Sequence, residues 1–275
     1  MAAKKILFIT TEIAPYMSET EMSVIARQLP QGIHERGKEI RTFMPKFGVI
    51  NERRNQLHEV IRLSGMNLII DDTDHPLIIK VASIQAARMQ IYFIDNDDFF
   101  QRKYLLHDEN GNEFQDNDER SIFYVRGVME TVKKLRWVPD LIHCHGWMTA
   151  LAPLYIKKHY KGDPCFKNSK VVYSIYNDDF NQSFKKGFAN KVKIDGVTSN
   201  DTKFIEKKAN FESLSKLAIN FSDGVIQGSP NIHPEVKKYA QLKEDVLFLE
   251  YQREDIYIDT FNEFYDQILA QNNNK

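Results

Sequence analysis

The chain has 275 residues, of which 42% are hydrophobic and 27% are charged, and its formal net charge is −1 at pH 7. Such a composition is that of an ordinary globular protein with a substantial core, and without a basic excess it argues against a nucleic-acid partner. Two cysteines are too few for a disulfide framework. The apolar stretch at residues 6–13 is too short and too polar for a signal peptide or a membrane span, so the sequence predicts a cytoplasmic protein with no membrane partner.

The chain opens with a strand, a helix and a second strand. Residues 5–11 (KILFITT) form a nearly continuous apolar run, which is typical of a buried parallel strand. A helix capped by Ser18 or Thr20 follows and runs to about Arg36, and residues 39–44 form the next strand. This order indicates a doubly wound unit. Its first loop lacks the G-x-G-x-x-G pattern, which disfavours a nicotinamide or flavin enzyme, and we expect no cofactor.

A β-rich insertion is predicted at about residues 57–89. Its strands are expected at residues 59–63, 67–70 and 76–83, each short and bounded by turn-forming residues. Residues 89–94 then return to a core strand. The pattern therefore indicates a β-hairpin inserted into an otherwise α/β chain.

The rest of the chain alternates between helix and strand patterns. Helices are predicted from Asp116 to about Arg136, from Trp147 to Lys158, from Phe204 to Asn220, from Ser229 to Ala240 and at 254–270, with strands at 141–145, 170–175 and 224–228 and a surface loop at 180–201. No Pro/Gly/Ser-rich linker divides the chain. We therefore predict a single domain over residues 1–275: a Rossmann-like, mostly parallel sheet with helices on both faces.

Two histidines stand out at the end of the strand 141–145. In a strand, His143 and His145 share one face and Cys144 lies on the other. The carboxyl end of a parallel strand is where α/β folds place their ligands. The alternative is a pair of hydrogen-bonded core histidines. With Cys144 on the opposite face and no third ligand at metal spacing, we predict no metal site.

Glu12 and Asp116 are weaker candidates. Glu12 follows the first strand, so it belongs either to a cleft or to a solvated loop. Asp116 stands at a helix start, where a carboxylate complements the helix dipole without any further role.

Six stretches, taken in order, resemble the bacterial glycogen synthases and plant starch synthases. They are ILFITTEIAPY (6–16), LP and RGKEIR with MP (29–45), YFIDN (92–96), DN with Arg120 and Phe123 (116–123), DLIHCHGWMTALAPLY (140–155), and the segment from Lys216 to Pro230 ending in SP. No single stretch is specific, but six in the right order indicate common ancestry.

The resemblance implies one half of a two-domain GT-B fold, the half that faces the glucan acceptor. The reaction of this family transfers glucose from ADP-glucose to an α-1,4-glucan with retention. By resemblance alone, His143 and His145 are the catalytic candidates. The substrate-binding residues that it implies are Glu12, Asp116, Asn117, His143, His145, Tyr176 and Asn177.

The chain departs from the family pattern at three places. The family's K-T-G-G-L-A-D-V loop is replaced by residues 18–24 (SETEMSV), so a diphosphate-bearing donor would meet Glu19 and Glu21 instead of a lysine and flexible glycines. The family's D-W-H becomes Gly146-Trp147-Met148, and its H-N becomes Tyr176-Asn177.

These departures lead to two functional hypotheses. We expect the family's donor-binding carboxyl-terminal domain to be absent from residues 1–275 and the helix at 254–270 to pack back on the sheet. The first hypothesis is a glucosyltransferase homologue that is inactive alone and that either retains weak binding of α-glucan or works beside a separately encoded donor-domain partner or as a homo-oligomer. The alternative is a non-catalytic regulatory or scaffolding protein that binds a protein partner or α-glucan, since a fold does not fix a function.

Overall fold

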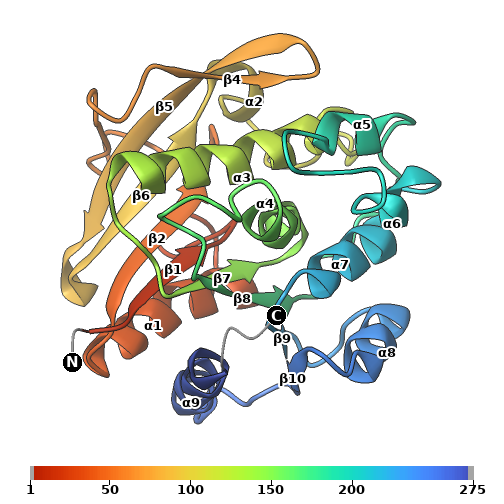
Figure 1. The fold of residues 1–275 in the computed structure, drawn as a ribbon. Coiled ribbons are helices and arrows are strands. Elements are labelled where there is room, and N and C mark those ends of the chain that lie inside the picture. Colours follow the sequence, from red (N-terminus) through yellow and green to blue (C-terminus); the bar gives the residue numbers. More distant parts are fainter. Residues whose placement is uncertain (1–2, 272–275) are drawn as a thin grey trace.

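The strand β1 (Lys5–Ile9) lies at the centre of the sheet, and its apolar side chains are buried on both faces. The computed structural model describes residues 3–271, in which β1 pairs in parallel with a strand on each side (Figure 1). The parallel strands, in spatial order, are β6 (Met89–Asp95), β2 (Glu39–Pro45), β1, β7 (Leu141–His145), β8 (Lys170–Ile175), β9 (Gly224–Gln227) and β10 (Leu247–Leu249). This is the strand order of a doubly wound sheet, and the mostly parallel sheet that the sequence predicts is confirmed.

An antiparallel extension continues the sheet beyond β6. The long strand β5 (Thr73–Ile84) pairs with β6, with β3 (His58–Glu59) and with β4 (Met66–Ile70). Asp71 and Asp72, with φ of 47° and 63°, form the two-residue turn between β4 and β5. The predicted strand at 59–63 is wrong, because the chain turns after Glu59 with the amides of Leu63 and Ser64 bonded to the Val60 carbonyl.

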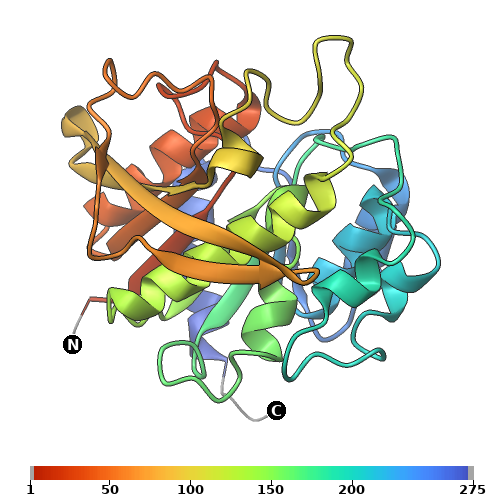
Figure 2. The same cartoon turned by 90° about the horizontal axis from the view of Figure 1, so that it is seen from above.

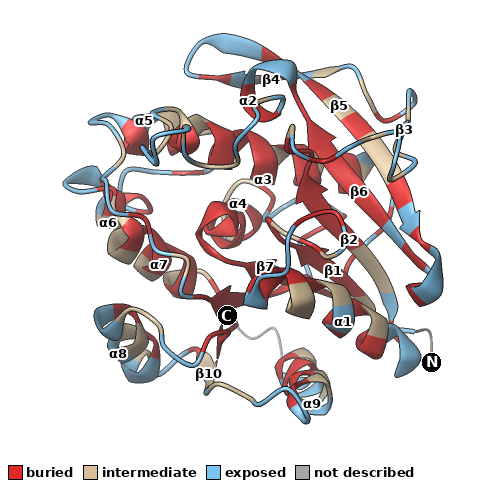
Figure 3. Ribbon diagram, turned by 180° about the vertical axis from the view of Figure 1, so that it is seen from behind, coloured by how far each residue is buried: buried red, intermediate tan, exposed pale blue. Residues whose placement is uncertain are grey.

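Helices cover both faces of the parallel strands (Figures 1 and 2). Alternate side chains of β1 and β7 point to opposite faces, so Phe8 and Leu141 pack on one side and Leu7 and Ile142 on the other. The first side is covered by α1 (Glu21–Glu35) and α9 (Tyr257–Ala270), and the second by α3 (Asn117–Lys134), α4 (Ala152–Lys157) and α7 (Phe211–Asn220). Figure 3 shows buried residues concentrated on the strands and on the helix sides that face them.

The helix boundaries follow side-chain caps. Thr20 caps α1 and forms a capping box with Ser23, which settles the choice between Ser18 and Thr20. Asn210 caps α7 in the same way, and the predicted helix 204–220 is therefore divided into α6 (Lys203–Glu206) and α7.

Three other helix predictions place the start of the helix too early. Residues 147–149 form a 3₁₀ turn and α4 begins only at Ala152, while the last helix begins at Tyr257. Helix α8 (Pro234–Leu242) begins after Ser229 because the Gln227 amide binds the carbonyls of Ser229 and Pro230 and holds that segment as a loop. The predicted surface loop 180–201 contains the short helix α5 (Phe188–Val192), and α2 (Asp97–Phe100) follows β6.

The terminal helix α9 lies on the sheet beside α1. Its side chains Phe261, Phe264, Tyr265 and Ile268 join a buried cluster with β1, β7, β8 and β9. Fully burying side chains of this size is worth about 1.5–3 kcal/mol each, so α9 is an integral part of this face. Among the described residues, no helix combines the length and apolar character needed to cross a membrane.

Candidate functional site

The candidate site lies at the carboxyl edge of the parallel strands. His143 and His145 end β7, and β8 on one side leads into Tyr176 and Asn177. On the other side β1 leads through Thr10 to Glu12. The fold therefore brings Glu12, the histidines and the Tyr176-Asn177 pair to neighbouring strand ends.

The two histidines share one face of β7, as the strand alternation predicts, and are completely buried. Their ring centroids are 3.9 Å apart. His143 Nδ1 is hydrogen-bonded to the Tyr265 hydroxyl of α9 at 2.6 Å, and its Nε2 to the Ser174 hydroxyl at 2.7 Å. His145 Nδ1 is hydrogen-bonded to the Tyr176 hydroxyl at 2.8 Å, whereas its Nε2 has no partner among residues 3–271. Both rings are thus enclosed by the protein itself.

Burial also fixes the charge of this pair. Desolvation, followed by the neighbouring His145, lowers the pKa of His143 well below its ordinary value. Burial lowers the pKa of His145 to about 3. Cys144 lies on the opposite face in the apolar core, and burial raises the pKa of its thiol. Both histidines are therefore neutral at pH 7 and Cys144 is an unreactive thiol.

Tyr176 stacks against His145 and is itself buried. It is 2% exposed, and its ring lies against Gly228, where an added Cβ would come within 2.9 Å of the ring. The next residue, Asn177, is exposed, and its backbone N–H donates a hydrogen bond to the Ser229 hydroxyl at 3.1 Å. Asn177 is thus the solvent-facing member of the predicted pair.

Carboxylates, not cations, hold the segment at residues 18–24. The Thr20 hydroxyl donates to the Glu12 carboxylate, and the Ser229 hydroxyl donates to Glu21. These bonds tie the start of α1 to the ends of β1 and β9. The segment itself carries Glu19 and Glu21 and no basic side chain.

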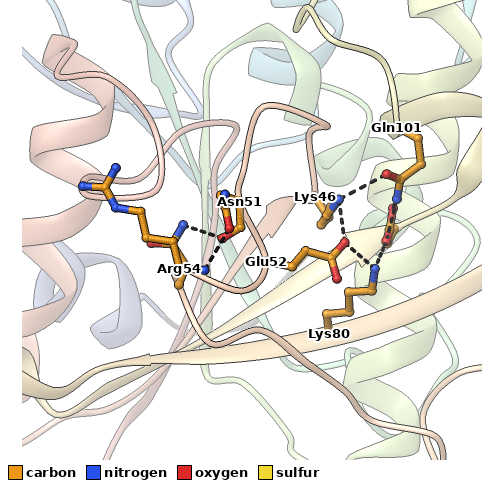
Figure 4. A network of polar contacts seen from close by, with 8 residues as sticks. Lys46, Asn51, Glu52, Arg54, Lys80 and Gln101 are labelled. Atoms are coloured by element: carbon orange, nitrogen blue, oxygen red, sulfur yellow. Dashed lines mark hydrogen bonds and ion pairs between the residues drawn. The ribbon is translucent and has the colours of Figure 1, made fainter.

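The lysines near the ends of β2 and β6 are already neutralised (Figure 4). Lys46 and Lys80 each place Nζ 2.7 Å from Glu52 Oε1, and Lys80 also lies 2.8 Å from the buried Asp95. Gln101 closes the ring by bonding both Lys46 and Asp95. The ring satisfies its own charges, so these lysines offer none to an anionic ligand.

Asp116 and Asn117 belong to a separate cluster. Arg102 pairs with both oxygens of Asp116; burial alone would raise the pKa of that carboxyl, but Arg102 holds it below its ordinary value. The Asn117 amide donates to the Leu106 carbonyl, and its oxygen accepts from Arg120. These contacts fasten the loop 101–116 to the start of α3, and none of them reaches the histidines.

Asp178 is a site residue that the sequence reasoning missed. Its Oδ2 accepts the Trp147 amide at 3.0 Å, and its Oδ1 is buried without a partner among the described residues. Burial raises the pKa of Asp178 to about 7, with the nearby Glu12 and Asp179 charges adding to the effect. The signal in the sequence was Gly146: a Cβ there would lie 2.4 Å from Asp178 Oδ2. Residues 3–271 contain no group of three or more His, Cys, Asp or Glu side chains placed to hold a metal ion.

The parallel sheet and its strand order define a Rossmann-like α/β domain, and folds of this kind place their ligands at the carboxyl edge of the strands. The fold resembles that of the catalytic domain of starch synthase IV from Arabidopsis thaliana bound to ADP and acarbose, with a TM-score of 0.71 at 16% identity over 93% of this chain and 53% of that one.

The starch synthase catalytic domain family model matches residues 5–247, and the chain belongs to this family. The glycogen synthase of Chlorobium limicola is 36% identical over 174 residues, and that of Chlorobaculum tepidum is 38% identical over 174 residues. In both cases the match covers 63% of this chain and 36% of the relative. The match thus spans about a third of the length of these relatives.

Proposed function

We propose that this chain acts in α-glucan metabolism as the acceptor-side half of a glycogen- or starch-synthase-type glucosyltransferase, binding α-glucan at the carboxyl edge and transferring no glucose by itself. Membership of the starch synthase catalytic domain family supports α-glucan as the ligand. The complete burial of His143 and His145 beneath Tyr176 and Tyr265 is the single observation that carries the absence of transfer. A sugar reaching either ring would have to displace a buried tyrosine.

Electrostatics support the same conclusion. Transfer from a nucleotide sugar requires that the charge of the diphosphate be neutralised and the two substrates aligned. At this edge the histidines are neutral, Lys46 and Lys80 are paired, and the segment 18–24 presents Glu19 and Glu21. An anionic donor would therefore be repelled where the family pattern carries a lysine. We propose that a separately encoded donor-domain partner or a second copy of the chain would supply the donor site.

A second candidate function is a non-catalytic regulatory or scaffolding protein. The contact that favours it is the hydrogen bond between Tyr265 of α9 and His143, which closes the site from within the chain. In this case the carboxyl edge would bind a protein partner instead of a glucan.

Two parallel measurements test the proposal: glucose transfer from labelled ADP-glucose to glycogen, and co-sedimentation of the purified chain with glycogen. We expect co-sedimentation without turnover. Asn177→Ala should weaken co-sedimentation because Asn177 is exposed at this edge, whereas Asn110→Ala in the exposed loop 101–116 should not. Turnover would contradict the inactive reading, and the lack of both activities would favour the protein-partner function.

A further inference from the structure

A groove of about 370 Å³ is lined in part by Gly228, which packs against the ring of Tyr176. Its walls come from the start of α1, the end of β9 and the chain leading into α9. Figure 1 shows α1 and α9 on the same face of the sheet. The lining residues share a lack of positive charge: Glu19, Thr20, Glu21, Val24, Ile25, Gln28, Gln227, Gly228, Tyr251, Gln252, Glu254, Tyr257 and Phe261. None of the predicted site residues lines this groove.

The carboxylates of the groove come from two separate segments. Glu19 and Glu21 stand at the start of α1, and Glu254 precedes α9. Glu19 and Glu254 are exposed and make no ion pair or hydrogen bond within residues 3–271. Burial, with the nearby charge of Glu254, raises the pKa of the Tyr257 hydroxyl to about 12. The groove therefore concentrates negative charge that no side chain of its own neutralises.

A buried amide in the same wall also lacks a partner. Gln227 is 3% exposed, and its Nε2 donates to the carbonyls of Ser229 and Pro230, each at 2.9 Å. Its Oε1 is left without a donor among the described residues. A buried acceptor without a partner destabilises the fold, so a ligand that brings a hydrogen-bond donor to this wall would recover part of that cost.

Three aromatic residues also line the groove. Tyr251 is half-buried, whereas Tyr257 and Phe261 are buried and reach the groove only with their edges. An ammonium group carries three donors and no acceptor, and it is attracted to the faces of aromatic rings. A diphosphate would be repelled by the three carboxylates, and a neutral sugar would leave their charge uncompensated.

We propose that this groove binds a linear aliphatic diamine or polyamine, whose ammonium groups are held by Glu19 and Glu21 at one end and Glu254 at the other and whose chain lies against the tyrosines. The ligand goes beyond the proposed glucan because it is a cation, although the groove adjoins the same edge: Thr20 is bonded to Glu12, and Ser229 is bonded to Glu21 and to the backbone amide of Asn177. Probes of different charge therefore test the two proposals separately.

Calorimetric titration measures the affinity of the chain for three small probes: spermidine as a cation, maltotriose as a neutral sugar and ADP as an anion. We expect spermidine alone to bind in the groove. The double variant Glu19→Gln with Glu254→Gln should weaken spermidine binding at least about threefold, since it removes two exposed carboxylates that attract the ammonium groups. Neither carboxylate has a partner within the described chain, so the fold should be retained.

The matched control is Glu109→Gln with Glu235→Gln, which removes two exposed carboxylates elsewhere and leaves the net charge equal to that of the test variant. Equal weakening in the control would show general attraction to an acidic surface and overturn the proposal. Unchanged binding in the test variant, or no binding to the wild type, would also overturn it. The test variant should co-sediment with glycogen as the wild type does. If the glucan proposal fails, the spermidine titration can therefore still be interpreted.

Discussion

The hydroxyl of Tyr265 joins α9 to the histidine pair, and Tyr265→Phe removes that link alone. Both side chains are fully buried, with 2.6 Å between the hydroxyl and His143 Nδ1. Phenylalanine keeps the ring in the apolar cluster, so the variant loses a hydrogen bond and leaves one imidazole nitrogen unsatisfied. Such a group costs about 1–3 kcal/mol. At roughly 2–4 °C for each kcal/mol in a protein of this size, the melting temperature should fall by roughly 2–12 °C.

Thermal and urea unfolding measure this loss, with Tyr104→Phe as the matched control because Tyr104 is 39% exposed and has no hydrogen bond among the described residues. Ser174→Ala removes the partner of the other ring nitrogen. A neutral imidazole has one donor and one acceptor, so the two bonds fix one tautomer together. The double variant should therefore deviate from additivity by more than about 0.5 kcal/mol. If Tyr265→Phe is as stable as the wild type, the hydroxyl does not hold the histidine and the argument fails.

Three further predictions concern the same edge and the charge network. His145→Phe should reduce the loss of unfolding free energy that the protein shows as the pH falls below 6.5. In the unfolded chain this histidine binds a proton below pH 6.5, whereas the buried ring, with a pKa of about 3, does not. The histidine therefore lowers the free energy of unfolding by about 1.4 kcal/mol for each pH unit between those two values. Urea titrations at pH 7, 6 and 5 that give the wild-type slope would contradict this. Gly146 and Gly65 both have positive φ, +76° and +84°, but a Cβ at residue 146 would lie 2.4 Å from a carboxylate oxygen whereas a Cβ at residue 65 would meet open space. Gly146→Ala should therefore lower the free energy of unfolding by at least about 1 kcal/mol more than Gly65→Ala. Equal losses would argue against a steric role for Gly146. Lys80→Met leaves the fully buried carboxylate of Asp95 without its ion pair and should cost about 3–5 kcal/mol. Lys237→Met in α8, whose partner Glu250 is exposed, should cost less than about 1 kcal/mol, and comparable losses would show that the network is not stabilising.

Local patterns predicted most of the parallel sheet. Residues 5–11 and 170–175 read as buried strands because both faces of the sheet are covered, so their apolar runs are continuous. The short strand β10 was missed: its three residues are only half-buried, so they carry no comparable pattern. The break between α6 and α7 was also missed, because it depends on the single capping residue Asn210 within a sequence of otherwise helical character.

The site was predictable only where the signal was local. Strand alternation placed His143 and His145 on one face, and that is confirmed. What encloses them comes from far along the chain: Tyr265 is separated from His143 by 122 positions, and only the return of α9 to the sheet brings them together. The implied binding roles of Asp116 and Asn117 remain predictions. In the structure their contacts hold the loop before α3.

The exchange at Gly146 changes how the departures from the family pattern should be understood. The family's D-W-H motif carries its aspartate where this chain has Gly146, which on sequence alone is a lost carboxylate. In the fold, Asp178 fills that space, with Oδ2 2.4 Å from where a Cβ of residue 146 would lie and bonded to the Trp147 amide. A carboxyl group is thus still present at the junction of β7 and β8, but burial raises its pKa to about 7, so near neutral pH it is half protonated. The edge therefore keeps a carboxyl group at this position, one that can donate or accept a hydrogen bond near neutral pH, and the sequence departure at residue 146 is offset by Asp178.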